Sequence, residues 1–157
     1  MKPKVYLETS IISYLAARPS RDLITAANQQ VTHTWWDKER ERFDVYISSM
    51  VLQEVTRGDP NAAHRRTQFL VDLQLLELGE NAVVLAEKLV QEKVVPKSVV
   101  EDALHIAVAA CAGMDYVLTW NFRHIANAML RNRIEDVIRS SGYEPPQICS
   151  PQELMEE

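Results

Sequence analysis

Short strand-like runs alternate with helical segments along this chain, and that alternation limits its possible folds more than any other feature. The runs are rich in β-branched and aromatic residues, whereas the segments between them place apolar residues at helical spacing. Five such runs are found, at residues 4–7, 43–48, 73–78, 116–119 and 147–149. Strands that alternate with helices predict a three-layer α/β/α sandwich around a mostly parallel central sheet.

The helix boundaries follow from capping residues and helix stops. We expect Ser20 to cap a long helix that continues to about residue 43, and Ser98 to cap a second helix that ends at Gly113. Asp59 and Pro60 form a cap followed by proline at the first helical position. The remaining helices are expected over residues 9–16, 49–58, 80–92 and 134–141.

The composition is that of an ordinary globular protein. A chain of 157 residues predicts a single domain, residues 1–157, with enough length to bury a core. The net charge of −5 argues against a protein that grips nucleic acid over its whole surface, although a local basic rim or metal ions could still engage RNA.

Neither a membrane segment nor a cysteine framework is predicted. Cys111 and Cys149 have no metal-knuckle or disulfide spacing, so we expect both to be reduced and structural. No apolar run approaches the ~18 residues of a membrane span, and no secretory signal pattern opens the chain. These observations predict a cytoplasmic protein.

Polar residues follow two of the predicted strands, where sites in parallel sheets form. Glu8 comes directly after the first strand, and Asn121 comes shortly after the fourth. Each has an ordinary structural alternative. A glutamate that starts a helix is favoured by the helix dipole, and an asparagine after a strand commonly forms a turn.

Two further acids lie on apolar helix faces. Glu54 falls on the apolar side of the helix after the second strand, and Asp102 lies in the first turn of an almost wholly apolar helix. Burial of either carboxylate needs a partner. Arg57 is the structural alternative for Glu54, and Glu101 is the better candidate for a residue that only complements the helix dipole.

Considered together, Glu8, Glu54 and Asp102 predict a metal site. Clustered carboxylates repel one another, and Mg²⁺ or Mn²⁺ relieves that repulsion because these ions prefer oxygen ligands. Phosphodiester hydrolysis is the chemistry that uses acids in this way.

Three segments of the sequence resemble the PIN-domain ribonucleases, and among them the VapC-type toxins of toxin–antitoxin pairs. The segments are "VYLETSIISYL", "ISSMVLQEVTRG" and "SVVEDALHIAVAACAGMDYVLTWNFRHI". The resemblance covers nearly the whole chain. It implies a compact α/β/α sandwich, metal-dependent endoribonuclease activity, homodimers and neutralisation by a small antitoxin protein.

The resemblance also assigns roles to individual residues. Glu8, Glu54 and Asp102 match the first, second and third acids of the family, and these are the expected catalytic residues and metal ligands. Asn121 falls where many members carry a fourth acid, and is an expected catalytic residue. Polar residues beside the first and fourth positions, expected to contact substrate or support the acids, are Thr9, Ser10 and Thr119.

Two departures from the family pattern matter for this site. The first acid is usually an aspartate, so Glu8 places its carboxylate one methylene farther from the backbone. Asn121 is neutral, which lowers the negative charge and weakens a second metal site. We expect an active enzyme centred on one metal ion. The alternatives are a catalytically weakened PIN-like module that binds RNA or a protein, and a protein whose acids are only structural.

Other residues carry weaker hypotheses. His105 is expected to be a hydrogen-bonded histidine in the helix packing, and Arg123 and His124 are candidates for contacting substrate. Two arginine pairs, Arg65–Arg66 and Arg131/Arg133, are either solvated or guide a phosphate backbone. Of Trp35 and Trp36, one is expected in the core and the other at a dimer or antitoxin contact.

Overall fold

A five-stranded parallel sheet forms the centre of the protein, whose computed structural model describes residues 1–156. The strand order is β3-β2-β1-β4-β5, and each neighbouring pair runs parallel. The α/β prediction is therefore confirmed. The strands are β1 (Lys4–Leu7), β2 (Asp44–Ser48), β3 (Gln74–Leu76), β4 (Tyr116–Leu118) and β5 (Gln147–Cys149).

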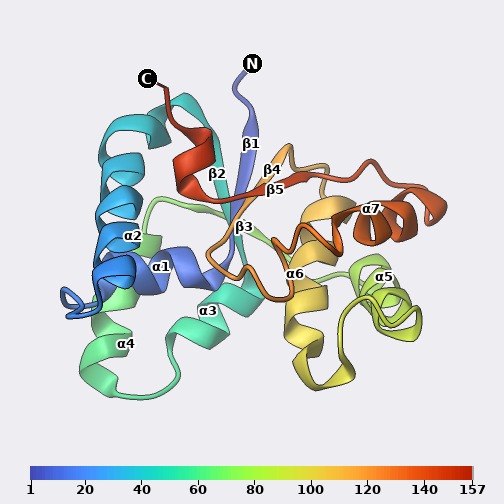
Figure 1. Cartoon of the computed structure of the whole chain (residues 1–157), viewed down its shortest axis with the longest axis horizontal. Coiled ribbons are helices and arrows are strands. Elements are labelled where there is room, and N and C mark those ends of the chain that lie inside the picture. Colours follow the sequence, from blue (N-terminus) through green and yellow to red (C-terminus); the bar gives the residue numbers. More distant parts are fainter. Residues whose placement is uncertain (157) are drawn as a thin grey trace.

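Helices cover both faces of this sheet (Figure 1). Four lie on one side: α1 (Thr9–Ala16), α2 (Leu23–Thr34), α3 (Ser49–Val55) and α4 (Pro60–Thr67). Three lie on the other: α5 (Glu80–Gln91), α6 (Val100–Cys111) and α7 (Arg131–Ser140). Short helical turns complete the chain: η1 (Trp35–Glu39), η2 (Arg40–Arg42), η3 (Gln68–Leu70), η4 (Lys97–Val99) and η5 (Pro151–Leu154).

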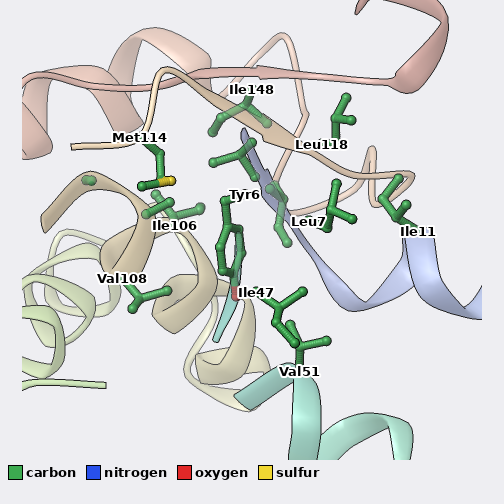
Figure 2. Close-up of a cluster of buried hydrophobic side chains, with 14 of the residues drawn as sticks. Tyr6, Leu7, Ile11, Ile47, Val51, Ile106, Val108, Met114, Leu118 and Ile148 are labelled. Atoms are coloured by element: carbon green, nitrogen blue, oxygen red, sulfur yellow. The ribbon is translucent and has the colours of Figure 1, made fainter. Parts of the chain in front are cut away.

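The middle strand, β1, is buried on both faces. Val5, Tyr6 and Leu7 have no exposed surface, because helices cover the sheet above and below them. Successive side chains of a strand point to opposite faces. Figure 2 accordingly shows Tyr6 near Ile106 of α6, while Leu7 lies on the side of Ile11 from α1. The strand therefore delivers Glu8 to the junction of the two helical layers.

Two of the predicted helix caps are wrong. Helix α2 begins at Leu23 and is capped by Asp22, whose carboxylate accepts the Thr25 N–H at 2.9 Å. The Ser20 hydroxyl instead accepts the N–H of Asp22 at 3.1 Å, because an aspartate nearer the helix takes the capping position. Ser98 lies within the 3₁₀ turn η4, so α6 begins only at Val100.

The cap of α4 and the glycine stops are confirmed, whereas α3 already ends at Val55 and α7 begins at Arg131, three residues earlier than predicted. Asp59 accepts the Ala62 N–H at 2.9 Å, and Pro60 is the first residue of α4. Gly58 and Gly113 have positive φ angles of 84° and 72°, which favour glycine after a helix. The predicted long helix to residue 43 is divided into α2, the π-helical turn η1 and the 3₁₀ turn η2.

The prediction that one tryptophan of the pair lies at a surface contact is wrong. Trp35 has no exposed surface, and Trp36 is only 9% exposed. Trp35 stacks on Phe43, whereas Trp36 packs edge-on against Phe69 and beneath the guanidinium of Arg40. Neighbouring positions of a helix point in different directions, but in this protein other side chains cover both tryptophans.

Both cysteines are free thiols, as expected. Cys149 is buried at the end of β5, and burial raises the pKa of its thiol to about 12. Across residues 1–156, the helices are too short or too polar for any of them to cross a bilayer.

Candidate active site

The three predicted acids come from three different elements that meet at the carboxyl ends of the strands. Glu8 joins β1 to α1, Glu54 lies in the last turn of α3, and Asp102 lies in the first turn of α6. Helix α3 follows β2 directly, and β2 pairs with β1. The topology therefore brings acids that are far apart in the sequence to one edge of the sheet.

Glu8 is a buried carboxylate held by two hydroxyl groups. Its side chain is 6% exposed, and its Oε1 accepts hydrogen bonds from Ser10 Oγ at 2.5 Å and Thr119 Oγ1 at 2.6 Å. Its backbone N–H donates a hydrogen bond to the carbonyl of Leu118, which extends the pairing of β1 with β4. Glu8 is the residue that precedes α1, but its side chain does not cap that helix. The hydroxyl contacts hold its carboxylate in one orientation.

Glu54 is held by a second set of donors. Its Oε1 accepts from His105 Nε2 at 2.5 Å and from Thr9 Oγ1 at 3.0 Å. Thr9 and Ser10, predicted as supporting residues, therefore bind different acids from adjacent positions of α1. The suggested partner of Glu54, Arg57, forms its ion pair with Glu101 instead, with two N···O distances of 3.2 Å.

A buried polar chain extends from Glu54 into the core. His105 has no exposed surface, and its Nδ1 lies 2.6 Å from the hydroxyl of Tyr6. That hydroxyl is also 2.8 Å from Ser48 Oγ. Both ring nitrogens of His105 thus have partners, so the expectation of a hydrogen-bonded histidine in the helix packing is confirmed.

The charges of all three acids act on the pKa of His105. Burial alone would lower the pKa of His105, but the hydrogen bond to Glu54 and the charges of Glu8, Glu54 and Asp102 raise it overall. Burial would likewise raise the pKa of Glu54, yet the bond and charge of His105 hold it below its usual value. The pair therefore favours a protonated His105 imidazole beside an ionised Glu54 carboxylate.

Asp102 and Asn121 are tied to the segment after β4. Asp102 Oδ2 lies 3.2 Å from His124 Nδ1, so His124 contacts a predicted acid. Asn121 Oδ1 accepts the backbone N–H of His124 at 3.0 Å, which matches the turn-forming alternative for this residue. The side chain of Arg123 is exposed at the same turn. A direct chemical role for Asn121 stays a prediction.

Each of the three acids has one oxygen engaged and one free. Within the described part of the chain, no hydrogen bond or ion pair reaches Oε2 of Glu8, Oε2 of Glu54 or Oδ1 of Asp102. Free carboxylate oxygens are the donors that Mg²⁺ and Mn²⁺ prefer. No three His, Cys, Asp or Glu side chains of residues 1–156 converge closely enough to form a metal-binding group. The donors fit such an ion in type, and binding requires the carboxylates to draw together.

Tyr6, His105 and Ser48 are the residues whose connection to the site was missed from the sequence. Ser48 ends β2, so the rule that drew attention to Glu8 also applied to it. Tyr6 is an inward residue of a buried strand, and its hydroxyl needs a partner. Nothing in the spacing of these residues shows that α6 and β1 lie close enough to join them.

Comparison with solved structures identifies the fold. No protein-family model matches the sequence, and no curated protein matches it. A chain of VapBC2 from Rickettsia felis, solved with a DNA fragment from its promoter, matches with a TM-score of 0.60 and 14% identity. The match covers 93% of this chain and 97% of that one. This chain has the fold of a VapC toxin. The resemblance to PIN-like proteins is thereby confirmed at the level of the fold.

A second VapC structure agrees with this result. VapC20 of Mycobacterium tuberculosis, described as a toxin that cleaves the sarcin–ricin loop, matches with a TM-score of 0.57 and 18% identity. The match covers 80% of this chain and 95% of VapC20. At such identities the VapC likeness establishes the fold, and the chemistry has to be argued from the side chains.

Proposed function

We infer that this protein is a metal-dependent endoribonuclease that hydrolyses RNA phosphodiester bonds, and that it is the toxin of a toxin–antitoxin pair. The observation that carries this inference is the arrangement of Glu8, Glu54 and Asp102. They come from three elements, their charges act on one buried histidine, and each keeps one oxygen free. Among the described residues these free oxygens are not buried, so a metal ion could reach them from solvent.

The acids would hold a Mg²⁺ or Mn²⁺ ion through their free oxygens. Such an ion supplies a Lewis acid that activates water and stabilises charge on the leaving oxygen. The residues around the acids orient them beforehand: Ser10 and Thr119 hold Glu8, while Thr9 and His105 hold Glu54. Supporting hydrogen bonds of this kind fix the engaged oxygens of Glu8 and Glu54 and raise the affinity of a carboxylate for a metal ion.

The turn after β4 would contact the RNA. Arg123 is exposed there, and His124 is anchored to Asp102, so both side chains flank the proposed metal ligands. Asn121 would support this turn through its hydrogen bond to the His124 backbone.

Partners and location follow from the proposed activity. The VapC-like fold and the paired VapBC2 assembly lead us to propose a small antitoxin protein as partner, and a homodimer as the active form. RNA as substrate implies a cytoplasmic protein. We also treat residues 1–157 as one domain, because the sheet draws its strands from residues 4–149.

The direct test is RNA cleavage by the purified protein with Mn²⁺ or Mg²⁺ and with EDTA. We expect cleavage that EDTA stops and that Asp102→Asn reduces by more than about 100-fold, since loss of a charged ligand should exceed the 10–100-fold effect of losing a supporting residue. Asp136→Asn, on the exposed face of α7, is the matched control and should keep the activity. Cleavage that survives EDTA or Asp102→Asn would contradict the assignment.

A specific observation favours a second function. The amide oxygen of Asn121 accepts a hydrogen bond within a turn, so the fourth family position adds no free oxygen ligand. One oxygen of Asp102, Oδ2, is bound by His124. A PIN-like module that binds RNA or a protein without cutting would have these features. It would bind RNA equally well with and without EDTA and show no cleavage under either condition.

A further inference from the structure

A basic pocket lies between α1 and α4. The pocket has a volume of about 310 Å³, and its lining contains Arg18, Arg65 and Arg66. The other lining residues are Ser13 and three alanines, with no aspartate or glutamate among them. The protein as a whole carries a net charge of −5, so three arginines without an acid form a local exception.

The arginines of the pocket differ in what already binds them. Arg66 is tied to the backbone, donating from Nε to the Val55 carbonyl at 2.9 Å and from Nη2 to the Arg57 carbonyl at 2.7 Å. Arg65 Nε is buried, yet it has no hydrogen-bond partner among the described residues. Arg18 is exposed and forms no ion pair within residues 1–156.

The unpartnered Nε of Arg65 argues against a purely solvated arginine face. A buried N–H without an acceptor is costly, and three neighbouring guanidinium groups repel one another. An anion bound in the pocket by the accessible guanidinium nitrogens would relieve the repulsion. The guanidinium group matches phosphate oxygens especially well, because its N–H donors form a rigid fork.

The position of the pocket connects it with the proposed active site. Ser13 lies one turn along α1 from Thr9, which binds Glu54, and one helical turn rises about 5.4 Å. Arg66 is anchored to Val55, the residue next to Glu54. The pocket therefore lies along α1 and α4 from the neighbourhood of Glu54. Figure 1 shows α1 lying over α4, with α7 on the opposite side of the molecule.

We propose that this arginine pocket binds a backbone phosphate of the RNA substrate next to the one that is cleaved. The proposal rests on the proposed ribonuclease function and adds the site that positions the strand. It also explains how an acidic protein could engage RNA locally: the acids hold the reacting phosphate through a metal, and the arginines hold its neighbour. Phosphate contacts of this kind set the register of the strand without reading its sequence.

The test uses a fluorescently labelled single-stranded oligoribonucleotide and anisotropy over a series of KCl concentrations, with the Asp102→Asn protein as parent. We expect Arg65→Gln and Arg18→Gln each to weaken binding about tenfold. Each should also reduce the slope of log K against log salt by about 0.7, the contribution of one phosphate contact on a single strand. Arg139→Gln on α7 is the control and should change neither quantity. Arg18 is exposed, so its variant tests the pocket even if Arg65→Gln fails to fold.

The outcomes separate this proposal from the proposed function. If the unchanged protein does not cleave RNA with Mn²⁺ or Mg²⁺, or if cleavage persists in Asp102→Asn, the proposed metal-dependent function is wrong, whatever the arginine variants do. If Asp102→Asn abolishes cleavage but the arginine variants keep the parent's affinity and salt slope, only the phosphate pocket is wrong. Variants that retain RNA binding and lose binding of polyglutamate would overturn the proposal in favour of an acidic protein partner.

Discussion

The carboxyl group of Glu8 lies one methylene farther from its backbone than an aspartate would place it. The structure accommodates this extra length by holding Oε1 between Ser10 and Thr119, one hydroxyl from α1 and one from the end of β4. The carboxylate is therefore positioned by both elements that flank it. This geometry explains how a longer acid can serve where the family pattern has a shorter one.

Exchange of Glu8 tests this role at the level of one side chain. Glu8→Asp keeps the charge and should keep part of the Mn²⁺ affinity, whereas Glu8→Ala removes a ligand and should weaken binding by at least about 100-fold. Isothermal titration with Mn²⁺ measures both variants against the unchanged protein. Equal affinities of the two variants would mean that Glu8 is not a metal ligand and serves only at the start of a helix.

Individual site residues were predictable where the reason was local. Glu8 follows a strand and Asp102 opens an apolar helix, and both facts are visible in the sequence. Asn121 was visible too, but its use as a turn former depends on the position of the His124 backbone. The alternative partner for Glu54 was wrong because Glu101 is within reach of Arg57, and two helices must be placed before that can be known.

At the scale of elements, α6 links the acids to the core. It is buried from Ala103 to Ala110 apart from Leu104, and it brings His105 against Tyr6 of β1 and Glu54 of α3. These two contacts join elements from both helical layers through the sheet. Sequence patterns identify each element, but they do not reveal which polar side chains meet, because that depends on how the helices pack.

The pair of Glu54 and His105 predicts a pH-dependent stability. The lowered pKa of Glu54 stabilises the fold above its ordinary value of 4.5, and this contribution is lost as pH falls through the folded pKa. The raised pKa of His105 stabilises the fold below 6.5, and this contribution is lost as pH rises through the folded pKa. Both contributions are present together between these two values.

Glu54→Gln should therefore lower the free energy of unfolding most between pH 4.5 and 6.5, by about 1–3 kcal/mol. Urea denaturation at a series of pH values measures the difference from the unchanged protein. Glu101→Gln removes an exposed pair with Arg57 and is the control, with an expected loss below about 1 kcal/mol. A loss from Glu54→Gln that is equal at all pH values would contradict the charged pair.

At the scale of the whole molecule, the sheet order explains why the site lies where it does. The order β3-β2-β1-β4-β5 places β1 in the middle, with the element after β2 on one side and the turn after β4 on the other. The alternation of strands and helices predicted a parallel sheet. It did not predict the strand order, because any right-handed set of crossovers satisfies the same local pattern.

The molecule also separates its charges in a way that suits the proposed substrate. Three acids lie at the end of β1 and within α3 and α6, while the arginine pocket lies between α1 and α4. The overall charge of −5 conceals this division. Composition could exclude a broadly basic surface, but only the packing of α1 on α4 brings the arginines together.

The central claim is that Glu8, Glu54 and Asp102 form one metal site, and a Mn²⁺ titration followed by electron paramagnetic resonance tests it most directly. The unchanged protein should bind a single Mn²⁺ ion per chain, and Asp102→Asn combined with Glu54→Gln should abolish that binding while circular dichroism shows the same fold. Asp136→Asn combined with Glu101→Gln, which also removes two acids, should leave binding intact. Undiminished Mn²⁺ binding by the first double variant would contradict the account.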